Sequence, residues 1–187
     1  AGGTVLLTAA QATSAVDNVI NVSGIVQAQS VAEVNGEIIL SAAGDGVVAV
    51  SGSLDASGTD AGETGGTIKV LGEKVGLFDS ASVDASGANG GGTVLVGGNW
   101  QGSGPERNAS ATFVSAGTTI SANAVDSGDG GTIVVWSDNN TNYHGSISAT
   151  GGANGGNGGC NSGAGQDLLW PLLALFALGA AALRRRR

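Results

Sequence analysis

The chain of 187 residues contains 35 glycines, two prolines, no methionine and 4% aromatic residues, a composition that fits neither a helical bundle nor an ordinary α/β enzyme. Its formal net charge is −8, and four of its seven basic residues are the terminal Arg184, Arg185, Arg186 and Arg187. The body that remains is strongly acidic, so nucleic acid and anionic lipid surfaces are excluded as its partners.

The amino-terminal end shows no secretion signal. The chain begins at Ala1, and no basic segment followed by an apolar one stands there. We therefore expect a fragment of a longer protein or a processed product.

One sequence unit recurs five times between residues 1 and 151. Each copy opens with Gly-Gly-Thr, or with Asn-Gly-Glu in the second copy, and the last residue of this triplet begins a short apolar strand. These strands start at Thr4, Glu37, Thr67, Thr93 and Thr132. Each copy ends in an apolar-polar-Ala strand, at residues 26–28, 54–56, 83–85, 120–122 and 147–149. A single copy of this unit cannot bury its own apolar residues. The repeat therefore predicts a β-solenoid, in which stacked copies bury them, and a meandering β-sandwich is the alternative.

Side chains of a strand alternate between its two faces, which predicts the core. We expect two inward-facing sets in the opening strands. They are Val5, Ile38, Ile68, Val94 and Ile133, and Leu7, Leu40, Val70, Val96 and Val135. In the closing strands the middle residue is polar in every copy, so that position should face water.

The outward positions of the opening strands are unusually apolar. They are Leu6, Ile39, Leu95 and Val134, with Lys69 as the only charged member. Two interpretations remain open: an exposed stripe that binds a partner, or a stripe covered by an inserted segment at residues 97–116, which carries Trp100 and Phe113.

Few residues of the sequence support a catalytic site or a metal site. Asp55 and Asp84 occupy equivalent positions of successive units, and paired carboxylates would suit a polysaccharide-acting enzyme, yet the interpretation we favour is two solvated aspartates. The stretch from Asp126 to Asp129 is expected to be an ordinary turn rather than a calcium repeat, and His144 has no second ligand nearby in sequence. We expect no catalytic residues, no metal and no cofactor.

Residues 91–151, which end in GGTIVVWSDNNTNYHGSISATG, resemble the repeat region of filamentous-haemagglutinin-type adhesins, the passengers of two-partner secretion. The resemblance is looser over residues 2–90. It implies an all-β, right-handed parallel β-helix, an outer-membrane transporter as partner, and a non-catalytic role in adhesion or biofilm, with a host or matrix glycan or protein as ligand. The secretion domain that the transporter would recognise is not visible in this piece.

The carboxyl-terminal part differs in composition from the repeats. Residues 152–167 form a Gly-rich linker that is expected to be flexible and contains Cys160, the only cysteine. Residues 168–187 comprise the apolar stretch Leu168 to Leu183 and the four arginines. We expect a short transmembrane helix whose arginines stay in the cytoplasm.

This tail resembles the bacterial C-terminal sorting signals called CTERM domains, nearest to the Cys-containing Myxococcus and JDVT types. The residues that carry the likeness are Gly158, Gly159, Cys160, Asp167 and Arg184 to Arg187. It implies a processing protease as partner and Cys160 as a processing or attachment point. Together these features predict an adhesin-like stalk at the cell surface or outer membrane, held transiently or permanently in the inner membrane by its tail. A β-helix enzyme acting on polysaccharide, or the tail of a larger enzyme, is the alternative.

Overall fold

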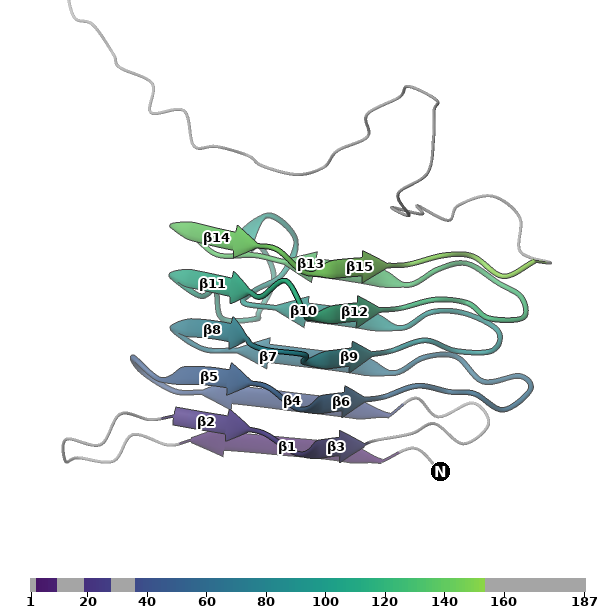
Figure 1. Cartoon of the computed structure of the whole chain (residues 1–187), viewed down its shortest axis with the longest axis horizontal. Helices are drawn as coiled ribbons and strands as arrows, with labels where there is room; N and C mark the ends of the chain where they lie inside the picture. The colour runs from purple at the N-terminus through teal and green to yellow at the C-terminus, as the bar shows by residue number, and fades with distance from the viewer. Residues whose placement is uncertain (1–2, 10–18, 28–35, 154–187) are drawn as a thin grey trace, which may run out of the picture.

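The computed structural model describes residues 3–9, 19–27 and 36–153, which form a parallel β-solenoid (Figure 1). Its strands belong to three five-stranded sheets. The first sheet contains β1 (Thr4–Ala9), β4 (Glu37–Ala42), β7 (Thr67–Leu71), β10 (Thr93–Val96) and β13 (Thr132–Val135). The second contains β2 (Val19–Val22), β5 (Val47–Val50), β8 (Lys74–Leu77), β11 (Ala111–Val114) and β14 (Asn140–Tyr143). The third contains β3 (Ile25–Gln27), β6 (Ser53–Asp55), β9 (Ser82–Asp84), β12 (Thr119–Ser121) and β15 (Ser146–Ser148).

Each rung of the solenoid contributes one strand to each sheet, and every pairing is parallel. The five opening strands of the sequence repeat form the first sheet in the expected register, in which Ile38 pairs with Ile68 and Ile68 with Val94. The closing strands form the third sheet, where Leu54 pairs with Val83. The expected solenoid is thus confirmed, and a sandwich is excluded because equivalent strands of successive rungs are neighbours.

The second sheet was not predicted from the sequence. Its strands lie between the two recognised ones and read VVAV, KVGL, ATFV and NTNY in the last four rungs. Only their inward positions share a character, as with Val50, Leu77 and Val114, which are fully buried. The rung therefore has three sides where the sequence motif had indicated two strands.

The core runs through the middle of the coil and is built from the predicted inward sets, except for Leu7 of the first rung, which is 37% exposed. Ile38, Leu40, Ile68, Val70, Val94 and Val96 are all 0% exposed. Val5, Ile133 and Val135 are only partly buried and pack against this core from the first and last rungs. Among the described residues, burial is completed by the rung above and the rung below, and the first and last rungs have such a neighbour on one side.

Glycines at the corner after the third sheet allow successive rungs to approach closely. A Cβ added to Gly65 would lie 1.8 Å from the carbonyl oxygen of Ala85, and one added to Gly92 would lie 2.0 Å from that of Gly66. In the same corner the amide of Gly92 donates to the Ala85 oxygen at 2.7 Å. The recurring Gly-Gly pair and the Ala that ends each closing strand therefore contact each other at this corner.

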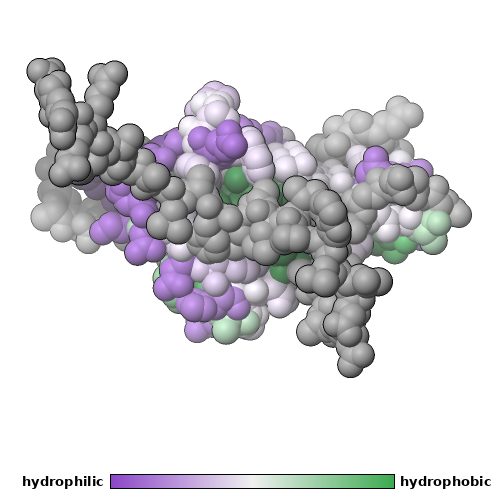
Figure 2. Space-filling model, turned by 90° about the horizontal axis from the view of Figure 1, so that it is seen from above, coloured by the Kyte–Doolittle hydropathy of each residue, from purple (hydrophilic) through white to green (hydrophobic). Residues whose placement is uncertain are grey.

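Seen from above the last rung, green hydrophobic surfaces appear beside white and pale purple ones (Figure 2). Tyr143, the inward residue of β14 that pairs with Val114, packs against the core at this end. Its buried hydroxyl has no hydrogen-bond partner among the described residues. Burial raises the pKa of Tyr143 to about 12.

Titration of the phenol tests this placement directly, because Tyr143 is the only tyrosine in the chain. We expect its phenolate absorbance to appear with a midpoint near pH 12 in the native protein and near the ordinary value of 10.0 in denaturant. Since the folded-state pKa is raised, stability is full below pH 10 and falls as the pH rises toward 12. Tyr143→Phe should remove this alkaline loss and stabilise the fold by about 1 kcal/mol at neutral pH. A native midpoint near pH 10 would contradict a buried hydroxyl.

Candidate binding surface

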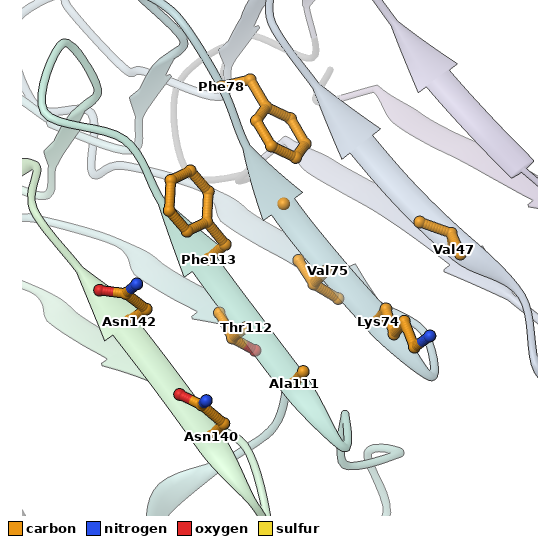
Figure 3. A pocket seen from close by; sticks show the side chains of 10 residues that line it. Val47, Lys74, Val75, Phe78, Ala111, Thr112, Phe113, Asn140 and Asn142 are labelled. Carbon is orange, nitrogen blue, oxygen red and sulfur yellow. The ribbon is translucent and has the colours of Figure 1, made fainter.

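The outer face of the second sheet contains a groove with a volume of about 380 Å³ (Figure 3). We call it the aromatic groove. It is lined by Val47, Lys74, Val75, Gly76, Phe78, Ala111, Thr112, Phe113, Asn140 and Asn142. The lining comes from four successive rungs, because residues 47, 74, 111 and 140 are paired in register across β5, β8, β11 and β14.

Two phenylalanine rings form the floor of the groove at one end. The centroids of Phe78 and Phe113 are 5.5 Å apart and the ring planes are inclined by 28°. Phe78 lies across Gly76, where an added Cβ would come within 2.2 Å of its ring. Figure 3 shows both rings with their faces turned outward rather than edge-on. A glycine in the middle of β8 is thus what allows the ring to lie flat on the sheet.

Polar side chains lie beside the rings. Asn142 pairs with Phe113 in the β11–β14 register, and Asn140 pairs with Ala111. In the described part of the chain, neither asparagine side chain makes a hydrogen bond or an ion pair. His144 contacts Phe113 edge-on at a centroid distance of 6.3 Å. The groove therefore combines flat apolar surface with free amide donors and acceptors.

An insertion at residues 97–110, between β10 and β11, folds against the outer face of the first sheet; it includes the short helix η1 (Trp100–Gly102). Glu106 forms a salt bridge with Lys69 at 3.2 Å, and Arg107 forms one with Glu73 at 2.6 Å. Hydrogen bonds from Asn99 and from Lys69 lower the pKa of the Glu106 carboxyl. Hydrogen bonds from Ser110 and Arg107 likewise lower the pKa of Glu73. Both carboxylates are thus held ionised at the base of the insertion.

This insertion decides between the two interpretations of the apolar stripe. Leu6, Ile39, Lys69, Leu95 and Val134 are aligned in register on one face, as predicted. Leu95 and Val134 are 4% and 7% exposed, whereas Leu6 is 58% exposed. The upper part of the stripe is therefore buried where the insertion reaches Lys69, and the lower part is accessible. Of the two aromatic residues of the expected segment, Trp100 is 54% exposed and Phe113 lies on the second sheet.

Asp55 and Asp84 are paired across β6 and β9, one rung apart, as the repeat predicted. Each carboxylate accepts a hydrogen bond from the backbone amide of the serine two residues later, at 3.0 Å from Ser57 and 2.9 Å from Ser86. Such a contact ends a strand by closing a short turn. The two aspartates therefore stabilise the corner between the third sheet and the next rung.

Substitution of Asp84 separates this role from a catalytic one. Asp84→Asn keeps the acceptor oxygen and removes the like charge opposite Asp55, so the free energy of unfolding should stay within about 0.5 kcal/mol of the native value. Asp84→Ala removes the acceptor and should cost about 1 kcal/mol in urea denaturation. A glycan-cleaving activity that Asp84→Asn abolished would reverse this assignment.

The remaining sequence candidates are not brought together. Within residues 3–9, 19–27 and 36–153, no group of three or more His, Cys, Asp and Glu side chains could hold a metal ion. No helix in these ranges is long and apolar enough to cross a membrane. Gly158, Gly159, Cys160, Asp167, Arg184, Arg185, Arg186, Arg187 and the stretch Leu168 to Leu183 lie outside the described residues.

Comparison with known proteins finds similarity among solved structures. No protein-family model matches the chain. No curated protein matches it either. Among solved structures, the secretion domain of HMW1 from Haemophilus influenzae is similar, with 28% sequence identity and a TM-score of 0.62. The match covers 81% of this chain and 40% of that one, so the chain spans well under half of the solved domain.

Proposed function

We propose that the chain is part of an exported surface protein of the two-partner-secretion type, in which the solenoid serves as a non-catalytic, adhesin-like stalk. The observation that carries the proposal is the similarity to the HMW1 secretion domain over 81% of the chain. The parallel solenoid described above agrees with it, because stacked rungs make a rigid rod whose length grows with the number of repeats.

The resemblance to this class of passenger also suggests the handedness of the coil. Parallel strands joined by crossovers are right-handed in nearly all known sheets. In Figure 1 the chain runs through the more distant first sheet in one direction, returns through the nearer second and third sheets, and rises by one rung per turn. This arrangement supports a right-handed coil.

The proposed partner in export is an outer-membrane transporter of the two-partner type. The acidic character of the chain, with a net charge of −8, suits passage through and display on an outer surface where solubility is required. We propose further that residues 152–167 form a spacer and that residues 168–187 place the chain in the inner membrane until a protease acts near Cys160. The support for this step is the order of Gly158, Gly159, Cys160, the apolar stretch and the four arginines in the sequence.

Disruption of the transporter gene in the organism that makes the protein tests the proposal. With the transporter present, the chain should be recovered from the outer-membrane and surface fractions; without it, the chain should accumulate in the periplasm or be degraded. Mass spectrometry of the surface form should show a new carboxyl terminus, or a modified Cys160. Unchanged export in the disrupted strain would reject the transporter, and a surface form that retains Arg187 and a free Cys160 thiol would reject processing.

A further inference from the structure

The aromatic groove is unusual for the outer face of a solenoid sheet. Exposed positions of the third sheet are small or polar, such as Ser53, Asp55 and Ser82, whereas the groove presents two phenylalanine rings. Phe78 is 40% exposed although no part of the core requires it there. We propose that the aromatic groove binds an uncharged glycan, with one sugar ring stacked on Phe78 and Phe113 and its hydroxyl groups bound by Asn140 and Asn142.

The geometry of the rings suits a sugar. One face of a pyranose ring consists of C–H bonds, and the negative face of an aromatic ring attracts such weakly positive hydrogens. Phe78 and Phe113 lie side by side with their faces outward, so together they offer a platform rather than a single contact (Figure 3). The flat position of Phe78 depends on Gly76, since any Cβ at that position would collide with the ring.

The polar residues of the groove match the rim of a sugar, which carries hydroxyl groups around its edge. The Asn140 and Asn142 amides each provide two N–H donors and one oxygen acceptor, and they make no hydrogen bond to the described residues. Both belong to β14: Asn142 lies opposite Phe113, at the strand spacing of about 4.8 Å, and Asn140 lies two residues earlier on the same strand, opposite Ala111. Free amides beside an apolar floor are the usual composition of a site for a small polar ligand.

Charge favours a neutral ligand. Lys74 is the only ionisable residue in the lining, and the chain as a whole carries a net charge of −8. An anionic glycan would be repelled by the net charge of the whole chain, and Lys74 is the one charge in the lining that would attract it. The lining holds no carboxylate, so it offers no general acid for cleaving a glycosidic bond, and the groove is a binding site.

A peptide strand fits this face less well. β8 is paired on both sides, with β5 and β11, and β11 is paired with β8 and β14. Their backbone groups are therefore already satisfied, and an added strand would have none to bind in the floor of the groove. A second copy of the chain, packed through the phenylalanines, is the other competing occupant, and the experiment below distinguishes it.

The test uses the full chain and three neutral probes, cellotetraose, xylotetraose and β-1,4-galactotetraose, in a saturation-transfer and titration experiment by NMR. At least one probe should bind, with saturation transferred to its ring C–H protons. Phe113→Ala and Phe78→Ala should each weaken that binding about tenfold, the change expected on losing one aromatic contact. Trp100→Ala is the matched control, because Trp100 is an exposed aromatic residue outside the groove, and it should leave the affinity unchanged.

Cellotetraose oxidised at each C6 carries a carboxylate in place of each C6 hydroxymethyl group and should bind more weakly than the parent. Absence of binding to all three neutral probes would overturn the inference, as would equal affinities for native protein, Phe113→Ala and Phe78→Ala when circular dichroism shows all three folded. A dimer in sedimentation that becomes a monomer in Phe113→Ala would assign the face to a second copy instead. The inference goes beyond the proposed function and does not depend on it, because these measurements are independent of where the chain is exported.

Discussion

Replacing Gly65 with alanine should destabilise the solenoid by about 3 kcal/mol, the largest effect expected for a change of one methyl group in this chain. The added Cβ would lie 1.8 Å from the Ala85 oxygen and 2.7 Å from the Gly92 amide nitrogen. Both of these atoms belong to the backbone of the next rung. They cannot move away from the added methyl group as the end of a flexible side chain could. The rungs would have to separate at a corner where their hydrogen bonds are continuous.

Gly24 supplies the matched control for this experiment. It also lies at a corner of the coil, between β2 and β3, but an added Cβ there would have no atom within 4 Å. Gly24→Ala should therefore change the free energy of unfolding by no more than about 0.5 kcal/mol. Equal stabilities of the two variants in urea denaturation would show that the rungs do not approach at Gly65 as described.

The second large effect concerns two neighbouring isoleucines of β4. Ile38 points inward and is 0% exposed, while Ile39 points outward and is only partly buried. Ile38→Ala removes buried atoms and leaves a cavity between two rungs, so it should cost about 2–4 kcal/mol. Ile39→Ala removes the same atoms from the surface side and should cost less than about 1 kcal/mol. A reversed order of the two losses would mean that the strand faces the other way, since a shift of one residue exchanges its faces.

The first and third sheets could be predicted because both their corner residues and their inward residues are restricted by contacts with neighbouring rungs. Gly65 and Gly92 have no room for a side chain, and Ala85 lies opposite them, so a Gly-Gly pair recurs before the opening strand in four of the five rungs. Inward positions such as Ile68 and Val94 face equivalent residues one rung away. Repeated geometry at fixed spacing therefore produces a repeated sequence, which can be recognised.

The second sheet could not be predicted for the opposite reason. Its outward positions differ in every rung, as in Val47, Lys74, Ala111 and Asn140. The 97–110 insertion also changes the spacing between the first and second strands of the fourth rung. Four-residue strands with only two inward positions give too weak an alternation to recognise.

The aromatic groove was missed because its parts are distant in sequence. Phe78 and Phe113 come from different rungs, and Asn142 from a third. One local signal was present: an isolated glycine inside a strand, as Gly76 is in β8, indicates the close approach of another group. Here that group is the Phe78 ring, two residues along the same chain.

The central claim, that this solenoid is displayed at the cell surface, is tested most directly with an antibody raised against residues 99–107. This part of the insertion includes the exposed Trp100 and Gln101. The antibody should label intact cells of the organism that makes the protein as strongly as permeabilised ones, and it should label intact cells only weakly when the transporter gene is disrupted. Labelling that appears only after permeabilisation of the native strain would contradict surface display.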